Sequence, residues 1–509
     1  MTKAVDILAC IIIFVFGVLL FVNRNYFLIP NPDVFGHFDD GKQYVQLKLP
    51  PNIQKPPANP IIIELLAKLL KPNGNSEILS AHLINIFAAI TLLLLVYLLI
   101  RQYSPYVGIF LVVLLCTNPQ FVFQSLDVTS EVLFGTSVVL TLLLYQRGHI
   151  VNAYICAGCS FLIRYEGACL LAALFVMDLA KNKVTLKTIR AFTLALVPIF
   201  IWLIIIHFRT LSGSIFGNGY IQELLMFRGR IPRLELITRL PFLLTDYFST
   251  TTWGVAYSLG AIILSLIVGS SVVFLMFTNN SLFCILSLFV CLYAASHFLY
   301  PFFADRYVYP ILWCLYAAPM LTSLHYIKRR RRTTGPFIIA AAIIGCAVLF
   351  YIAIGNAQKI RTYYQNTSAS STAFSRFTRY DVLLAANWLN SMKFSNHSIV
   401  IVDEPWIMKY FTHNKNVSFL SLPYSEYTQC SSVTCIIKNQ KLEALGGQIL
   451  FIQLSNTLLE DASFPSATYF NIPIFNEFDR GDDVNKFALL AVLSHNDVWA
   501  RIYQYRQKQ

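Results

Sequence analysis

The sequence has 509 residues, of which 56% are hydrophobic and only 13% are charged, and its mean hydropathy is +0.59. Soluble proteins have about 25% charged residues, so this composition excludes a soluble enzyme, a disordered chain and a fibrous repeat. The net charge of +13 would suggest nucleic acid in a soluble protein. In a membrane protein it fits cytoplasmic loops that collect Lys and Arg, so we expect no nucleic-acid partner.

Apolar runs that could cross a bilayer begin close to the N-terminus. The first, at 7–22, is not followed by a signal-peptide cleavage site, and we interpret it as a retained span. Further runs lie at 80–100, 106–123, 131–146, 150–163, 166–180, 191–208, 257–277, 281–299, 307–325 and 336–354. They predict about eleven spans, and the number changes by two if the short runs 150–163 and 166–180 are one interrupted helix pair.

Basic residues are concentrated in alternate loops, and this pattern predicts the topology. With the N-terminus in the cytoplasm, all of these loops are cytoplasmic, as the positive-inside rule requires. They contain Arg101, Arg147, the basic residues of 181–190 and those of 328–332. The segments 23–79, 209–256 and 356–509 are then outside. Within the first of them, 61–70 predicts a short helix on the membrane surface.

Residues 356–509 differ in composition from the apolar chain before them. Strand patterns at 398–402, 417–422, 448–454, 489–493 and 500–505, with a helix at 404–411, predict a small α/β domain. We therefore divide the chain into a membrane domain at 1–355 and an extracytoplasmic domain at 356–509. Cys430 and Cys435, the two cysteines outside the apolar runs, would form a disulfide if that side is oxidising.

Carboxylates and arginines lie at the outer ends of the predicted spans, where ionisable residues are often functional. Asp39 and Asp40 follow the first span and provide a general base or a metal ligand, unless they belong to a solvated loop. Asp127 and Glu131 are four residues apart and so share one face of a helix. They are either part of a site or residues that favour the helix dipole.

Two further groups contain arginine. Arg164 and Glu166 lie between two apolar runs, as a packing pair or as part of a site. Arg306 precedes Tyr307, and it can bind a phosphate bidentately or serve as an interfacial anchor. Together the four groups suit a substrate with a lipid tail and a phosphate head. The sequence has no P-loop, dinucleotide-binding fingerprint, HExxH or GxSxG motif, which disfavours nucleotide-driven, zinc-hydrolase and serine-hydrolase chemistry.

Five short motifs follow one another in 1–355. They are Asp40-Gly41-Lys42-Gln43-Tyr44, Lys55-Pro56-Pro57, Asn118-Pro119 through Glu131, Arg164-Tyr165-Glu166-Gly167 and Arg306-Tyr307-x-x-Pro310. Their order resembles that of the integral-membrane glycosyltransferases of the GT-C fold that use polyprenyl-phosphate sugars, such as the protein O-mannosyltransferases and the lipid A aminoarabinose transferases. The first pair is Asp-Asp where these families commonly have Asp-Glu, so the acting carboxylate stays open, as does the choice between Glu131 and Asp127.

This resemblance implies an α-helical polytopic membrane protein of the GT-C fold, with about 11 transmembrane helices and a small C-terminal α/β extracytoplasmic domain. It also implies a hexosyl- or pentosyltransferase that moves a sugar from a polyprenyl-phosphate donor to an acceptor hydroxyl, with inversion. Its partners would be the lipid-linked sugar, a glycan, lipid or protein acceptor, and the bilayer. Its location would be the plasma (inner) membrane, or the ER membrane with a lumenal C-terminal domain in a eukaryote.

The resemblance further assigns roles to individual residues. Asp40, with Asp39 as second choice, would be the catalytic base, and Glu131 or Asp127 would orient the acceptor or hold a divalent metal such as Mg²⁺ or Mn²⁺, whose use stays open. The donor phosphate would be bound by Arg306, Arg164, Arg228 and Arg230. Supporting roles would fall to Tyr44, Lys55, Glu166 and Tyr307.

Two alternative functions share the membrane location. A lipid-linked glycan polymerase or ligase would move whole oligosaccharides, and the acidic loop directly after the first span argues against it. A transporter or flippase would keep ionisable groups near the bilayer midplane and often has two related halves, and neither feature is evident in the sequence.

Overall fold

The protein was analysed as a computed structural model. The structure describes residues 2–24, 32–50, 55–70, 76–181, 185–210, 266–299, 308–329, 380–394, 397–402, 405–421, 433–439, 442, 447–454, 486–495 and 498–506. The chain forms two compact units, one of residues Met1–Asn25 and His37–Arg361 and one of Tyr26–Gly36 and Thr362–Gln509. The first unit thus ends at Arg361, and the short segment Tyr26–Gly36 belongs to the second unit.

The first unit is helical. Its long helices are α1 (Thr2–Val22), α4 (Ser76–Arg101), α7 (Ser130–Gln146), α10 (Leu186–Thr210), α14 (Ser281–Leu299) and α15 (Tyr309–Arg329). Its shorter helices are α3 (Ala58–Leu69), α5 (Pro105–Thr117), α6 (Pro119–Leu126), α8 (Ile150–Phe161), α9 (Gly167–Lys181) and, from His37 onward, α2 (Pro32–Val45). Leu266–Met276 is also helical.

Three of the described helices are long and apolar enough to cross a membrane, namely Lys3–Val22, Ser76–Arg101 and Leu186–Ile206. Several apolar helices are shorter, among them α8 with 12 residues. At 1.5 Å per residue, such a helix extends only about 18 Å, less than the hydrocarbon core. The runs 150–163 and 166–180 form two short helices, α8 and α9, separated by a turn. The apolar helices make this a multi-pass membrane protein.

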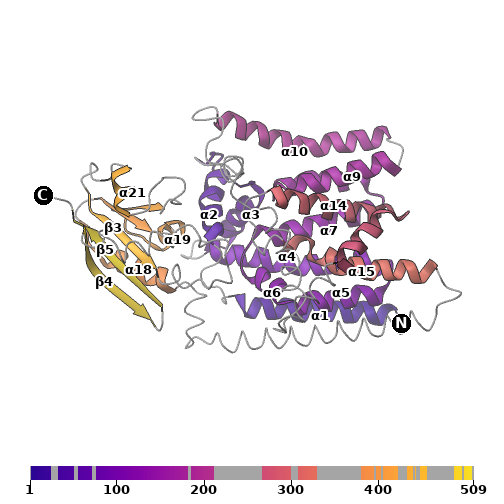
Figure 1. The fold of residues 1–509 in the computed structure, drawn as a ribbon, viewed down its shortest axis with the longest axis horizontal. Helices are drawn as coiled ribbons and strands as arrows, with labels where there is room; N and C mark the ends of the chain where they lie inside the picture. Colours follow the sequence, from indigo (N-terminus) through magenta and orange to yellow (C-terminus); the bar gives the residue numbers. More distant parts are fainter. Residues whose placement is uncertain are drawn as a thin grey trace. The chain divides into compact units, whose positions relative to one another are not determined.

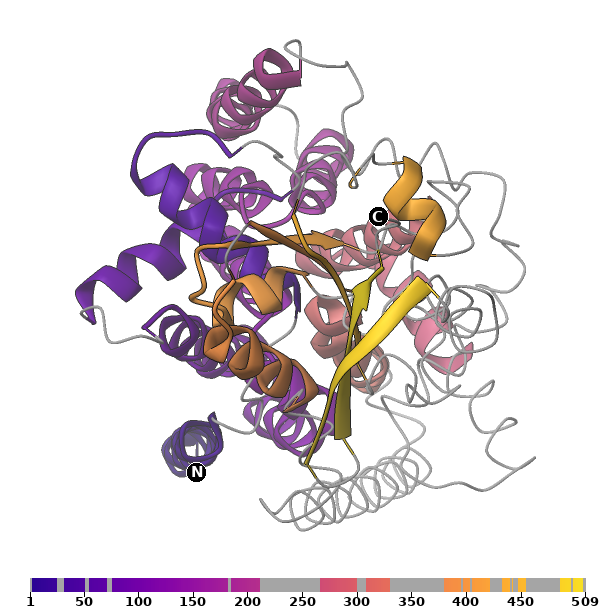
Figure 2. The same ribbon diagram turned by 90° about the vertical axis from the view of Figure 1, so that its left-hand side faces the viewer.

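The ends of the bundle are marked by charged contacts. At the N-terminal end, Asp6 of α1 accepts hydrogen bonds from Tyr97 at 2.6 Å and Arg101 at 2.9 Å, both of α4. Figure 1 shows the N-terminus at this end and α2 and α3 at the opposite one, steeply inclined to the long helices. In Figure 2 the bundle is seen along its length, with α1 nearly end-on. We call the end of the bundle that contains α2 and α3, opposite the N-terminus, the α2–α3 end.

The apolar run 106–123 forms two helices because of Asn118 and Pro119. α5 ends at Thr117, and Pro119, which lacks a backbone N–H, occupies the first position of α6. The Asn118 side-chain oxygen accepts from the Phe121 N–H at 2.8 Å and caps α6, while its amide donates to Tyr316 at 2.9 Å. The break brings the chain to Glu131 at the start of α7, at the α2–α3 end.

The second unit contains the predicted strands, which form a mixed sheet. Its strands are β1 (Ser398–Val402), β2 (Val417–Ser421), β3 (Ile449–Leu454), β4 (Phe487–His495) and β5 (Val498–Tyr505), in the order β2-β1-β3-β5-β4. β1 pairs in parallel with β2 and β3, and β5 pairs antiparallel with β3 and β4. The strands β1 and β3 are fully buried, as apolar runs without alternation predict.

Helices α18 (Tyr380–Ser391), α19 (Pro405–Phe411) and α21 (Val433–Asn439) complete the second unit. Val433 and Ile437 of α21 pack on Ile401, Ile449 and Phe451 in its apolar core. The expected α/β alternation is confirmed, with element bounds within one or two residues of those predicted for β1, α19, β2 and β3.

Candidate functional site

Helix α2 carries the first acidic pair. Val34, Phe38, Gly41 and Tyr44 form its buried face, at intervals of three or four residues. Asp40 lies beside this face and is half-buried. Burial raises the pKa of Asp40 from 3.8 to about 6, while Lys55 opposes the shift and Asp39 adds to it. A carboxyl group with this pKa is ionised at neutral pH and is basic enough to accept a proton.

Lys55 and the two prolines after it lead into α3. The helix itself, with Ile62, Leu65 and Leu69 on its exposed side, confirms the predicted short helix and is typical of a membrane-surface position. It packs tightly on α2, because a Cβ atom at Gly41 would lie 2.5 Å from the Pro60 carbonyl oxygen. The small residue after Asp40 thus permits the contact that brings Lys55 close to it.

Arg164 lies at the centre of a buried ion-pair cluster between α8 and α9. One guanidinium nitrogen lies 2.8 Å from Glu131 of α7 and donates to Ser130 at 3.0 Å. The other lies 2.8 Å from Glu166. Burial opposes ionisation of Glu166, but the Arg164 charge outweighs it, so the pKa of Glu166 is lowered. The sequence placed Arg164 and Glu166 together, and the structure adds Glu131.

His297 of α14 is a member of this cluster that the sequence analysis missed. Its Nε2 lies 3.5 Å from Glu166, and its ring packs against Tyr293 with centroids 4.6 Å apart. The signal was a titratable residue near the end of the apolar run 281–299, where charge has no role in solubility. Ser130 gave no signal, because an isolated serine at a helix start is an ordinary capping residue.

The acidic helix and the arginine cluster occupy the same end of the bundle. The backbone N–H of Ala58, where α3 begins, donates to the Leu162 carbonyl at 2.9 Å, two residues before Arg164. The Tyr44 hydroxyl interacts electrostatically with both Asp40 and Tyr165. Gly167 is required here, since a Cβ atom would collide with the Phe161 backbone. Three predicted motifs therefore form one site region.

The other predicted site residues are placed as follows. Asp127 is the C-cap of α6, and of the two acidic candidates it is Glu131 that contacts Arg164. Arg306, Tyr307, Arg228 and Arg230 lie outside the described residues. So does Cys430, and Cys435 lies in α21, where only the backbone is described.

A divalent metal site needs several oxygen, nitrogen or sulfur ligands close together. Within the described part of the chain, no group of three or more His, Cys, Asp or Glu residues is arranged to hold an ion. Glu131 is paired with the Arg164 guanidinium at 2.8 Å, and a divalent cation there would face that positive charge. The described surroundings of Glu131 therefore do not fit a metal site.

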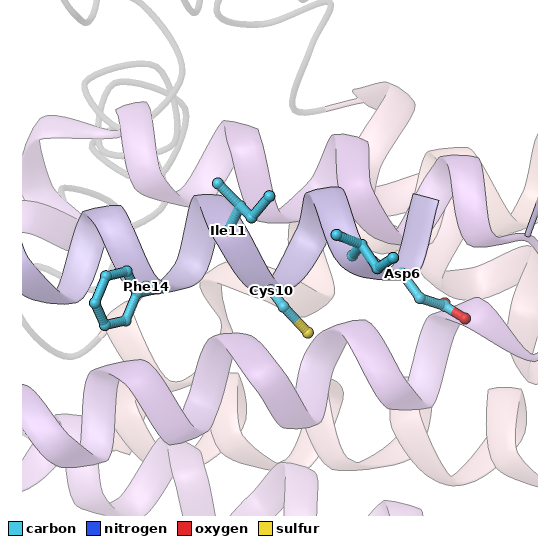
Figure 3. A pocket seen from close by; sticks show the side chains of 5 residues that line it. Asp6, Cys10, Ile11 and Phe14 are labelled. Carbon is cyan, nitrogen blue, oxygen red and sulfur yellow. The ribbon is translucent and has the colours of Figure 1, made fainter. Parts of the chain in front are cut away.

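A surface pocket of about 410 Å³ lies elsewhere, on α1. Figure 3 shows Asp6, Cys10, Ile11 and Phe14 along this one helix. Its carboxylate, Asp6, is bound to Arg101, and Phe14 is 71% exposed. An apolar helix face of this kind suits contact with lipid rather than catalysis.

Part of the chain resembles a known protein family, and its fold resembles that of solved structures. Residues 54–207 match the family described as dolichyl-phosphate-mannose-protein mannosyltransferase. No curated protein sequence matches the chain significantly. Among solved structures, ArnT from Cupriavidus metallidurans bound to undecaprenyl phosphate has a TM-score of 0.55 at 10% identity, over 97% of each chain.

Two further structures are similar. ArnT from the same organism in the apo state has a TM-score of 0.53 at 11% identity, over 96% of this chain and 97% of its own. The Archaeoglobus fulgidus oligosaccharyltransferase in the apo form has a TM-score of 0.51 at 10% identity, over 88% of this chain and 69% of its own. The chain therefore has the GT-C fold of polytopic membrane glycosyltransferases.

Proposed function

We propose that this protein transfers a sugar from a polyprenyl-phosphate carrier to an acceptor hydroxyl, with inversion at the anomeric carbon. The observation that carries the proposal is the position of Asp40, a half-buried carboxylate beside Lys55, at the same end of the bundle as the Arg164 cluster. The mannosyltransferase match over 54–207 includes Lys55, Glu131 and Arg164, and ArnT was crystallised with undecaprenyl phosphate.

The chemical step requires a base and a stabilised leaving group. Asp40 accepts the acceptor O–H proton as the oxygen attacks the anomeric carbon. The new C–O bond forms from the opposite face while the bond to the phosphate oxygen breaks, and the carrier phosphate leaves with the electron pair. A phosphate leaves without protonation when cations stabilise its charge. Asp39 is the alternative base, and its charge also helps to keep the pKa of Asp40 high.

The leaving phosphate needs positively charged residues close to it. Arg164 is engaged by two carboxylates, Glu131 and Glu166, at 2.8 Å each, so its positive charge is already paired. Arg164 is therefore better suited to position Glu131, which would orient the acceptor, than to bind phosphate. Among the residues that the structure describes, Lys55 carries a positive charge that acts on Asp40. Arg306, Arg228 and Arg230 remain the other proposed phosphate ligands, and Tyr307 a supporting residue.

The orientation and location are part of the same proposal. We place the N-terminus and the basic loops in the cytoplasm and the α2–α3 end outside, in the plasma membrane, or in the ER lumen in a eukaryote. The fold shared with an oligosaccharyltransferase supports a second candidate, transfer of a larger lipid-linked glycan.

The experiment uses the full-length protein in nanodiscs, supplied with polyprenyl-phosphate monosaccharides and with lipid-linked oligosaccharides. Asp40→Asn should lower the transfer rate by at least about 100-fold, the scale of general-base catalysis. Asp6→Asn, the same change at the opposite end, should leave the rate unchanged. Full transfer by both Asp40→Asn and Asp39→Asn would rule out the base assignment, and turnover of oligosaccharide donors alone would favour the second candidate.

A further inference from the structure

An aromatic cluster lies next to the proposed base. Tyr44 comes from α2, Tyr165 from the turn between α8 and α9, and Trp202 from α10. The rings of Tyr44 and Trp202 meet edge to face with centroids 6.0 Å apart. The Tyr165 ring packs edge to face on Phe161 with centroids 5.3 Å apart, and Tyr165 lies close enough to Tyr44 for the two to interact electrostatically. Three elements distant in sequence thus bring aromatic rings with polar atoms to one place.

The Tyr44 hydroxyl is an exception to the usual pairing of buried polar groups. Tyr44 is 8% exposed, and its hydroxyl is buried with no hydrogen-bond partner among the residues that the structure describes. A buried hydroxyl without a partner destabilises the fold, and such groups are rare in native proteins. A phenylalanine would fill the same space without this cost, so the hydroxyl is best explained by a ligand.

The position of the hydroxyl defines which ligand it can meet. Tyr44 follows Asp40 by four residues and therefore lies one helical turn along the same face, and the two side chains interact electrostatically. Whatever binds Tyr44 is thus next to the group that would take the acceptor proton. In the proposed reaction, the donor sugar ring must be held there with its anomeric carbon near Asp40.

A sugar ring matches the chemistry of the cluster. Its C–H faces pack on aromatic rings, and its hydroxyls need donors and acceptors, which a tyrosine hydroxyl supplies together. The donor always carries a sugar, whereas the acceptor can be a glycan, a lipid or a protein. We propose that Tyr44, Tyr165 and Trp202 form the subsite that binds the ring of the donor sugar, with the Tyr44 hydroxyl bonded to a sugar hydroxyl. This inference rests on the proposed function.

The test separates the sugar from its carrier. Binding to the full-length protein in nanodiscs is measured for sugar-free undecaprenyl phosphate and for its mannosyl, glucosyl and galactosyl derivatives. The wild type should bind at least one derivative more tightly than the sugar-free lipid. Tyr44→Phe should reduce that preference by about 5- to 10-fold, the loss of one hydrogen bond, and leave sugar-free binding within twofold. Trp202→Phe should reduce the same preference.

Two controls make the result specific. Tyr106→Phe alters a tyrosine that is 54% exposed, on α5, and should change neither affinity. In the absence of lipid, Tyr44→Phe should have a Tm equal to or above that of the wild type, because no hydrogen bond is lost.

Each contrary outcome has its own meaning. An unchanged sugar preference in Tyr44→Phe would overturn the subsite. A lower Tm of this variant without lipid would also overturn it, because the hydroxyl would then form a hydrogen bond within the protein. Absence of any sugar preference in the wild type would overturn it as well. Failure of the wild type to bind any of the four lipids would instead refute the proposed donor class, and the subsite with it.

Discussion

At the residue scale, Asp40 connects burial with chemistry. Its pKa of about 6 results from burial, opposed by Lys55 and increased by Asp39. The carboxyl must be ionised to act as a base, so the transfer rate should rise with pH below about 6 and level off above it. The same shift makes ionised Asp40 unfavourable for folding, because stability from this group is greatest below pH 3.8 and declines as the pH rises through about 6. Asp40→Asn should therefore keep or raise the Tm at pH 7.

The two neighbouring charges give a paired prediction. Lys55→Gln removes the charge that lowers the pKa of Asp40, so the acidic limb of the pH–rate profile should move to higher pH. Asp39→Asn removes the charge that raises it, so the limb should move to lower pH. Measuring kcat between pH 4.5 and 8.5 in the two variants checks both signs. Shifts in the same direction would mean that Asp40 does not control the profile.

Arg164 gives a second prediction at this scale, for stability. Arg164→Gln leaves Glu131 and Glu166 buried without their cation, which should cost about 3–5 kcal/mol and lower the Tm strongly. Arg101→Gln is the matched control, because the Arg101–Asp6 pair is considerably more exposed and such pairs contribute about 1 kcal/mol or less. Thermal unfolding in one detergent compares them. Adding Glu131→Gln to Arg164→Gln should recover part of the loss, and equal effects of the two arginine variants would contradict the cluster.

At the element scale, the contact between α2 and α3 sets the distance from Asp40 to Lys55. Gly41→Ala would push a methyl group against the Pro60 carbonyl and Glu64, which should destabilise the protein by about 1–3 kcal/mol. It should also weaken the interaction of Lys55 with Asp40, so the acidic limb of the rate profile should move upward.

Gly36→Ala provides the matched control in the same helix. A Cβ atom there meets nothing within 4 Å, and alanine favours a helix over glycine by about 0.5–1 kcal/mol. Its Tm should therefore be unchanged or higher. Tm values and pH profiles of both variants in one detergent check the prediction, and it is wrong if the two variants have the same Tm.

At the scale of the whole molecule, the direction of the helices sorts charge between the two ends of the bundle. α4 ends at Arg101, which donates to Asp6 near the N-terminus, and Gln146 at the end of α7 donates to Tyr103, two residues after Arg101. Arg101 and Arg147 therefore lie at the same end of the bundle as the N-terminus. Cysteines introduced at His149 and Lys48 should react with a membrane-impermeant maleimide from opposite sides, His149→Cys in inside-out vesicles and Lys48→Cys in right-side-out ones. Labelling of both from the same side would refute the topology.

Much of the fold was predictable because lipid and buried sheets impose simple patterns. Long apolar runs predicted helices α1, α4 and α10, and short unbroken apolar runs predicted strands β1 and β3. The apolar run 106–123 extends beyond the helix end, because its hydropathy continues past Asn118 and Pro119, where α5 ends and α6 begins. In the site, the motif around Arg164 was predicted, whereas its partner Glu131 was left open against Asp127. The choice stayed open because either carboxylate could simply favour the dipole of the helix that follows.

The sequence alone determined that the chain belongs in a membrane, which residues carry charge at the ends of spans, and that a small α/β unit follows. These properties depend on composition and short-range periodicity. Only the tertiary structure decided that Arg164 is paired with two carboxylates, that His297 joins them, and that the Tyr44 hydroxyl is buried beside Asp40 and Trp202. The contacts of Arg164 with Glu131, of Glu166 with His297 and of Tyr44 with Trp202 join elements far apart in sequence. They depend on side-chain packing between helices, which a local sequence pattern does not encode.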